Sequence, residues 1–289
     1  MLKVGRIRDI WRYPVKAMAG ERVEFCAVDI HGLTGDRRWA LRDEARQEVQ
    51  SCKTRPQLLQ CQAKFLSSES AGENDAVQIS FADGTIMVGS NPDIHARLSS
   101  AVGRPSTLQA IRPAADTAFY RRYKSDGNNW LKELEATFER HGGEASPDLG
   151  NLSQIQMDYV SIPGSLFLST PFHLITTATL ASLSNLNPEA DWDMRRFRPN
   201  VVIQTEPRFD GFVEQGWVGK RLALGGTILT IVGPTVRCGA ITRAQGGLVF
   251  DAGMLRTVVR SAGQNAGVYG EIEQSGLLNT GDDVVLLDS

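Results

Sequence analysis

Residues 77–88 read VQISFADGTIMV, which is two short apolar runs around a tight turn. Asp83 and Gly84 tolerate the positive φ that hairpin turns need, so the stretch predicts a β-hairpin. Similar runs of strand type fill the first hundred residues, at Val4–Tyr13, Val23–Ile30, Arg38–Arg42 and Leu58–Phe65. Many short strands at close spacing indicate a β-barrel or a β-sandwich.

The pattern changes twice further along the chain. Residues 128–143, NNWLKELEATFERHGG, have helical spacing and end in two glycines, and the polar stretch EASPDLGNLSQ follows them. We interpret this region as a linker or a variable insert. From Leu166 onward, strand-like runs return, with one strand leading into a helix in HLITTATLASLSNL and another helix expected over Asp251–Gly263.

The composition is that of an ordinary globular protein. The chain has 289 residues, 42% of them hydrophobic, and a net charge of -2. This charge gives no reason to expect nucleic acid or an anionic membrane as a partner. No apolar run is long enough for a membrane span, and the N-terminus lacks the apolar core of a signal peptide, so we expect a cytoplasmic protein with reduced thiols.

Cations and amides gather at turns and strand ends, where they could bind an anion. In RRFRPN, Pro199 is expected to push Arg198 toward extended backbone, with Asn200 just inside the following strand. Lys16 follows a proline turn, and Arg37 lies in a glycine-rich loop. Each could contact a phosphate, or each could form a solvated surface pair.

Among the four cysteines, Cys238 has the most reactive setting. It lies between Arg237 and Gly239 after a strand that contains proline, so partial exposure and a favoured thiolate are expected. A lone cysteine is more often a buried apolar residue, and Cys26 and Cys61 fit that description. Cys52 looks more exposed. His173 could orient a substrate, although a structural histidine with satisfied hydrogen bonds is the simpler interpretation.

Four segments in order carry a family resemblance: YPVKAMAG (residues 13–20), GLTGDRRW (residues 32–39), RRFRPNVVI (residues 195–203) and PTVRCGAIT (residues 234–242). Together they resemble the MOSC superfamily with its N-terminal β-barrel domain, including the mitochondrial amidoxime-reducing component and its bacterial relatives. The resemblance covers most of the chain apart from Asp116–Ser161. It implies a mostly β fold with a few helices, in which an N-terminal β-barrel domain (residues 1–112) packs against a C-terminal MOSC β-barrel domain (residues 162–289). Residues 113–161 would be a variable helical insert.

The resemblance also implies molybdenum cofactor, a metal held by a pyranopterin dithiolene that carries a phosphate. Cys238 matches the cysteine that ligates molybdenum and is therefore the expected catalytic residue. The positions expected to bind the cofactor are Lys16, Arg37, Ser169, Thr170, Arg198, Asn200 and Arg237. Pyridoxal phosphate binding is associated with MOSC domains in general and is assigned to no residue of this chain. We expect no pyridoxal-phosphate sulfurase domain ahead of the chain.

Three positions depart from the relatives. Ala17 replaces a frequent serine, Leu168 stands where the amidoxime-reducing relatives have aspartate, and GAITRAQ replaces TTVDP after the cysteine. Three functions are compatible with these residues. The first is a reductase of N-hydroxylated small molecules that receives electrons from a separate donor protein. The second is a cofactor or sulfur carrier without redox turnover. A purely structural β-barrel interaction domain is a third possibility.

Overall fold

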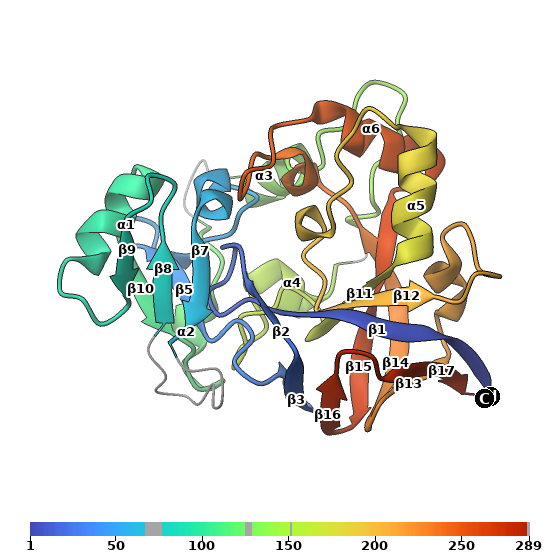
Figure 1. Ribbon diagram of the computed structural model, residues 1–289. Helices are drawn as coiled ribbons and strands as arrows, with labels where there is room; N and C mark the ends of the chain where they lie inside the picture. The colour runs from blue at the N-terminus through green and yellow to red at the C-terminus, as the bar shows by residue number, and fades with distance from the viewer. Residues whose placement is uncertain (67–76, 125–128, 151, 288–289) are drawn as a thin grey trace.

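A closed β-barrel occupies one half of the molecule (Figure 1). The computed structural model describes residues 1–66, 77–124, 129–150 and 152–287. Around the barrel the strands follow the order β12, β11, β15, β14, β13, β17, β1, and β1 pairs again with β12. Their bounds are β1 Leu2–Arg12, β11 Phe172–Thr176, β12 Val201–Thr205, β13 Arg221–Leu224, β14 Thr227–Val236, β15 Asn265–Gln274 and β17 Asp283–Leu287.

The two ends of the chain meet in this barrel. β1 pairs with β17 near the C-terminus, with Leu2 opposite Leu286, and with β12 on its other edge. Alternate side chains of β13 and β14 point inward and form one core with β1, β11 and β12. Because closure leaves no free edge, the barrel holds the loops at its rim in fixed positions.

A second unit with its own apolar core lies beside the barrel, on the left in Figure 1. The elements that surround this core are β5 (Trp39–Asp43), η1 (Pro56–Gln60), β7 (Gln62–Phe65), β8 (Val77–Ser80), β9 (Ile86–Val88), α1 (Ile94–Val102) and β10 (Ser106–Ala110). The short strands β2 (Glu21–Val23), β3 (Phe25–Asp29), β4 (Gly32–Leu33), β6 (Glu48–Val49) and β16 (Gly276–Asn279) complete the sheets.

Helices cover one end of the barrel. α5 (Thr177–Leu186) and α6 (Ala252–Ser261) begin at Thr176 and Asp251, whose side chains accept a backbone N–H of the first turn. Their apolar faces pack with the short helices η2 (Met194–Arg196) and η4 (Gly239–Thr242). A further short helix, η3, spans Val213–Trp217. This packing fixes the loops that carry Arg198 and Cys238.

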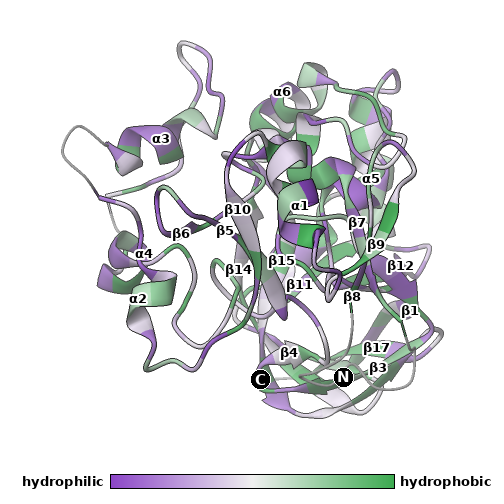
Figure 2. Ribbon diagram, turned by 90° about the vertical axis from the view of Figure 1, so that its left-hand side faces the viewer, coloured by the Kyte–Doolittle hydropathy of each residue, from purple (hydrophilic) through white to green (hydrophobic). Residues whose placement is uncertain are grey.

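The middle of the chain forms three short helices, which Figure 2 shows together at one side of the molecule. They are α2 (Thr117–Tyr120), α3 (Trp130–Ala136) and α4 (Gln154–Asp158). Arg46 pairs with Glu133 and so connects the turn before β6 with α3. Parts of the predicted insert (residues 125–128 and 151) and the last two residues of the chain lie outside the described residues. The insert boundaries therefore stay a proposal.

The mostly β fold is confirmed, and so is the hairpin at residues 77–88. β8 and β9 pair antiparallel, and Gly84 has φ 84° in the turn. Two predicted elements are wrong in extent. The strand expected over Leu58–Phe65 begins as the helix η1, because Pro56 starts a helical turn there. The helix expected to continue to Gly142 ends at Ala136.

In the part of the chain that the structure describes, none of the helices combines the length and the apolar character that crossing a membrane requires.

Candidate functional site

Cys238 lies where β14 ends and η4 begins. It is half-buried, which confirms the expected partial exposure, whereas Cys26 and Cys61 are buried as expected. Burial raises the pKa of Cys52, and the charge of Cys238 adds to this increase. The charge of Cys238 also opposes the lowering of the Arg237 pKa by burial and adds to the raised pKa of Tyr269. Cys238 is therefore close to a second thiol from the N-terminal unit.

The loop at residues 32–39 is held by Asp36, a buried acid. Its carboxylate accepts the backbone N–H of Tyr13 at 2.7 Å and Nδ2 of Asn200 at 2.8 Å, and it pairs with Arg37. These contacts join three segments that are far apart in the sequence. Arg37 has φ 50°, a conformation rare outside glycine, and its guanidinium lies 5.0 Å from the ring centroid of Tyr13.

Arg198 departs from the geometry expected for it. Its φ is 57°, in the left-handed region, whereas Pro199 was expected to favour extended backbone. This conformation costs on the order of 1–3 kcal/mol and persists only where the surroundings impose it. His173 and Tyr13 supply that constraint, since Nδ1 of His173 lies 3.2 Å from the Arg198 carbonyl oxygen and the Tyr13 hydroxyl donates to the carbonyl of Pro199 at 3.0 Å.

The Arg198 side chain points back toward the N-terminal unit. Nη1 donates to the carbonyl of Met18 at 2.5 Å, and the guanidinium lies 4.4 Å from the ring centroid of Tyr13. Nη2 is buried and has no hydrogen-bond partner within the described residues. A buried charged donor without a partner is costly, so an acceptor from outside the described residues would be favourable here.

Lys16 is buried in the same region. Nζ donates to the carbonyl of Leu166 at 2.6 Å and to Oγ of Ser161 at 3.0 Å. Burial, and next the charge of Arg37, lower the pKa of Lys16 to about 7. Lys16, Arg37 and Arg198 thus form a largely buried cationic cluster, and burial together with the charge of Arg37 lowers the pKa of Arg198 as well.

Asn200 and Arg237 belong to a hydrogen-bond network within the protein. Oδ1 of Asn200 accepts from the backbone N–H of His173 at 3.1 Å. Arg237 donates to the carbonyl oxygens of Ala266 at 2.8 Å and Phe197 at 3.0 Å, and lies 2.7 Å from Nε2 of His173. Burial lowers the pKa of Arg237 to about 10 and holds that of His173 well below its usual value. His173 is therefore neutral and structural, and a cofactor role for Asn200 and Arg237 stays a prediction.

Ser169 and Thr170 are half-buried in the segment before β11. Oγ1 of Thr170 donates to the carbonyl of Phe172 at 3.5 Å. The segment lies beside the cationic cluster, because the ring of Phe167 lies 5.2 Å from the guanidinium of Arg37. Leu168 is exposed in the same segment.

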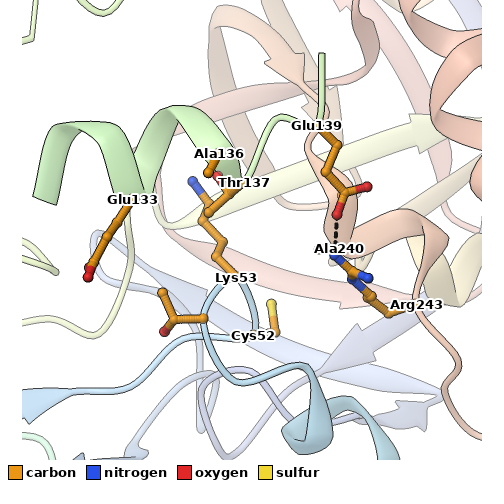
Figure 3. Close-up of a pocket in the computed structure, with 10 residues that line it drawn as sticks. Cys52, Lys53, Glu133, Ala136, Thr137, Glu139, Ala240 and Arg243 are labelled. Carbon is orange, nitrogen blue, oxygen red and sulfur yellow. Dashed lines mark hydrogen bonds and ion pairs between the residues drawn. The ribbon is translucent and has the colours of Figure 1, made fainter. Parts of the chain in front are cut away.

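A cavity of about 300 Å³ opens beside η4 (Figure 3). Cys52, Lys53, Thr137 and Glu139 line it, together with Gly239 directly after Cys238. The cavity therefore lies between the N-terminal unit, the insert and the loop of Cys238. Sequence reasoning singled out neither Cys52 nor Lys53, although the run CKTRP has two cations near a thiol.

Comparison with known families decides the identity of the fold. The MOSC domain model matches residues 138–285, and the MOSC N-terminal beta barrel domain model matches residues 4–109. The chain belongs to the MOSC domain family. This family is associated with molybdenum-cofactor binding.

Two solved structures are distantly similar to this MOSC chain. The YUAD protein from Bacillus subtilis is 10% identical with a TM-score of 0.43, and the match covers 98% of this chain and 97% of that one. YiiM from Geobacillus stearothermophilus is 12% identical with a TM-score of 0.30, over 41% of this chain and 54% of that one. Comparison with the curated proteins finds no match.

The residues around Cys238 fit the cofactor associated with MOSC domains. Within the described residues, no group of three or more His, Cys, Asp or Glu side chains could hold a metal ion by itself. A dithiolene would bring sulfur donors of its own, and the thiolate of Cys238 suits a soft metal. The buried cationic cluster and the unpartnered Nη2 of Arg198 suit the phosphate of such a group.

Proposed function

We propose that this MOSC protein is a molybdenum-cofactor-dependent oxidoreductase that reduces N-hydroxylated small molecules with electrons from a separate donor protein. The observation that carries the proposal is the position of Cys238. Its half-buried thiol lies near the cavity beside η4, since the next residue, Gly239, lines that cavity. The thiol also lies near Cys52, whose pKa is affected by Arg198 and Lys16 of the cationic cluster. The same thiol can therefore serve a bound cofactor and face a substrate.

Each of the predicted site residues has a role in this proposal. Cys238 is the metal ligand, and Lys16, Arg37 and Arg198 neutralise the phosphate and pterin oxygens. Ser169 and Thr170 add hydroxyl donors at the edge of the cluster. Asn200 and Arg237 position the two loops through Asp36, His173 and the backbone. The bound cofactor would supply two-electron oxygen-atom chemistry, which the side chains alone cannot provide.

The cavity beside η4 is the proposed substrate site. Its volume of about 300 Å³ suits a small molecule. Lys53 lines it and has no ion-pair partner within the described residues, while its Nζ lies 5.4 Å from the ring centroid of Phe138. Glu133 and Glu139 also line the cavity, but each pairs with an arginine. Substrates that carry an anionic group next to the N-hydroxyl function would therefore be favoured by Lys53.

Elemental analysis of three proteins tests the proposal. Wild type, Cys238→Ala and the control Cys61→Ala are purified from a host that makes the cofactor, and molybdenum and the oxidised pterin fluorophore are measured. We expect near-stoichiometric molybdenum in wild type and Cys61→Ala, and its loss in Cys238→Ala. Unchanged molybdenum in Cys238→Ala contradicts the ligand assignment.

A turnover assay separates the reductase from a carrier. Wild type with bound molybdenum is given hydroxylamine and an artificial electron donor. Reduction that is lost in Cys238→Ala supports the reductase. Bound molybdenum without any reduction contradicts it and favours a protein that stores or delivers the cofactor.

A further inference from the structure

Glu214 is a buried acid that the proposed cofactor site does not use. It lies in η3, where Phe212 just before it packs with the core of α5 and α6, while Val213 and Trp217 pack with the core of the barrel. Its side chain is 0% exposed between these two apolar cores, and burial raises its pKa. A buried carboxyl group is costly unless it is hydrogen-bonded, so its contacts indicate what it does.

Three donors from two elements fix the orientation of this carboxyl group. The hydroxyl groups of Thr176 and Thr179, at the start of α5, each donate to it at 2.7 Å. The backbone N–H of Gly267 in β15 donates to its Oε1 at 3.1 Å. Thr176 is itself fixed, because its Oγ1 caps α5 and accepts the backbone N–H of Thr179 at 3.1 Å. Glu214 therefore connects the start of α5 with β15 inside the molecule.

A bulge in β15 makes one peptide group available for this contact. Where β15 pairs with the end of β14, two of its residues, Ala266 and Gly267, oppose the single residue Thr235. Such a bulge disrupts the hydrogen-bond ladder locally. The N–H of the Ala266–Gly267 peptide donates to Glu214, and its carbonyl accepts Nε of Arg237 at 2.8 Å. One planar peptide group thus lies between a buried carboxyl group and a buried guanidinium group.

The same network continues from Arg237 to both Cys238 and Arg198. Arg237 directly precedes Cys238, and its Nη1 donates to the carbonyl of Phe197 at 3.0 Å. Its Nη2 lies 2.7 Å from Nε2 of His173. A guanidinium group only donates, so Nε2 accepts, and the proton of the neutral imidazole is on Nδ1. Nδ1 therefore donates to the Arg198 carbonyl at 3.2 Å.

The orientation of the bulged peptide controls the position of Arg237. Both Nε and Nη2 of Arg237 donate to the Ala266 carbonyl. The peptide also packs on the imidazole, because a Cβ on Gly267 would meet Nε2 of His173 at 2.7 Å. A peptide that rotated away from Glu214 would withdraw the acceptor from Arg237 and disturb the contact of Arg237 with His173.

We propose that Glu214 is a positioning residue of the cofactor site. By orienting the Ala266–Gly267 peptide, it holds Arg237 in place, and Arg237 in turn sets the loop of Cys238 and the left-handed backbone of Arg198. The proposal rests on the proposed function only where it refers to the cofactor, since the network itself requires no metal. Glu214 acts through Arg237 and is not itself a ligand.

Molybdenum content of the variants Glu214→Gln and Glu214→Leu tests this role. Glutamine keeps an oxygen that can accept the N–H of Gly267, whereas leucine has a similar volume and no acceptor. The control Leu222→Ala truncates a buried side chain of β13 in the barrel core, outside the network. Each full chain is purified from a host that makes the cofactor, and molybdenum is measured per folded chain. We expect Glu214→Leu to retain about a tenth of the wild-type content, as when a hydrogen-bonded partner of a metal site is lost, and the other two variants to stay near wild type.

The tautomer of His173 is a readout that reduced stability alone does not change. The chain has four histidines, and long-range 1H–15N NMR with His173→Gln for assignment reports which ring nitrogen carries the proton. We expect the proton on Nδ1 in wild type, Glu214→Gln and Leu222→Ala, and a mixture of tautomers in Glu214→Leu. Amide exchange in the peptide that contains Cys238 should become about tenfold faster in Glu214→Leu, as for loss of one buried hydrogen bond. If Glu214→Leu does not fold, Thr179→Val, which removes one group that orients Glu214, should show the same changes to a smaller extent.

The outcomes separate this proposal from the proposed function. Wild-type molybdenum content together with an unchanged His173 tautomer in Glu214→Leu overturns the positioning role and leaves the proposed function standing. An equal loss of molybdenum in Leu222→Ala also overturns it, because Glu214 would then act only through stability. If wild type itself carries no molybdenum, the proposed function fails, and the tautomer and exchange measurements decide the role of Glu214 by themselves.

Discussion

Glu139 and Gly239 are in direct contact, and a Cβ on the glycine would collide with the carboxyl group of Glu139. The backbone reinforces this contact, because the N–H of Gly239 donates to the carbonyl of Thr137 at 2.8 Å. Glu139 also pairs with Arg243 at the end of η4. The segment directly after α3 thus lies on the loop that begins at Cys238, and the absence of a side chain on Gly239 permits it.

Glu139→Ala should expose this loop without unfolding the protein. The pair with Arg243 is partly exposed, so its loss should change the free energy of unfolding by less than about 1 kcal/mol. Amide exchange at residues 137–145 and alkylation of Cys238 by iodoacetamide, followed by peptide mass spectrometry, should both become faster. The control Glu135→Ala changes an exposed carboxylate of α3. Equal alkylation rates in all three proteins would show that Glu139 does not restrict access.

Lys16 should make the stability of the protein depend on pH. Its pKa is lowered from 10.5 to about 7 by burial, Arg37, Lys53 and Arg198, against an opposing effect of Cys52. Between about pH 7 and 10.5 the unfolded chain therefore binds more protons, and the free energy of unfolding should rise with pH by at most about 1.4 kcal/mol per pH unit. Lys16→Met should remove this contribution, as measured by urea unfolding at pH 7, 8 and 9.

The exposed Lys220 offers a matched control for this experiment. Lys220→Met should keep the slope of wild type, because its ammonium group lies in solvent in both states. A slope that is identical in wild type and Lys16→Met would show that Lys16 is not titrating in this range.

Lys53→Met should alter substrate preference, if the cavity beside η4 is the substrate site. For an N-hydroxylated substrate with a carboxylate, KM should rise about three- to tenfold and kcat should stay similar, because one charge-assisted contact is lost before the chemical step. A neutral substrate should be unaffected. The control Lys132→Met changes an exposed lysine of α3 that does not line the cavity. A loss of kcat for both substrates would place Lys53 in a different role.

Much of the fold could be predicted because buried and exposed residues alternate along a strand that has one buried face. β3, β8 and β14 follow that pattern. β15 was not predicted. It contains Gly267 and Gly270, and it lies so close to β11 that a Cβ on Gly267 would meet the carbonyl of Leu174 at 2.6 Å. Close approach of two backbones selects glycine there, and glycine hides the strand from a reading based on propensity.

The site could be predicted only in part, because several of its contacts form only in the folded chain. The sequence singles out Arg198 and Cys238 by their local settings, at a proline turn and a strand end. It does not show that Asp36 connects Tyr13 with Asn200, because those contacts exist only after the barrel closes. The left-handed backbone of Arg198 is likewise imposed by tertiary contacts that override the local effect of Pro199.

Arg237 should prove to be essential for stability, whatever it contributes to a cofactor. It is 7% exposed, and its guanidinium binds the carbonyl oxygens of Ala266 and Phe197 and contacts His173. Arg237→Met would leave these acceptors buried without a donor, which should lower the free energy of unfolding by about 3 kcal/mol or more. Arg237→Lys should fall between, because a single ammonium cannot reach all three. Arg243→Met, at a partly exposed arginine nearby, should cost less than about 1 kcal/mol. Equal urea midpoints for Arg237→Met and wild type would mean that the carbonyls find other donors, and the role of Arg237 would then have to be sought at the site next to Cys238.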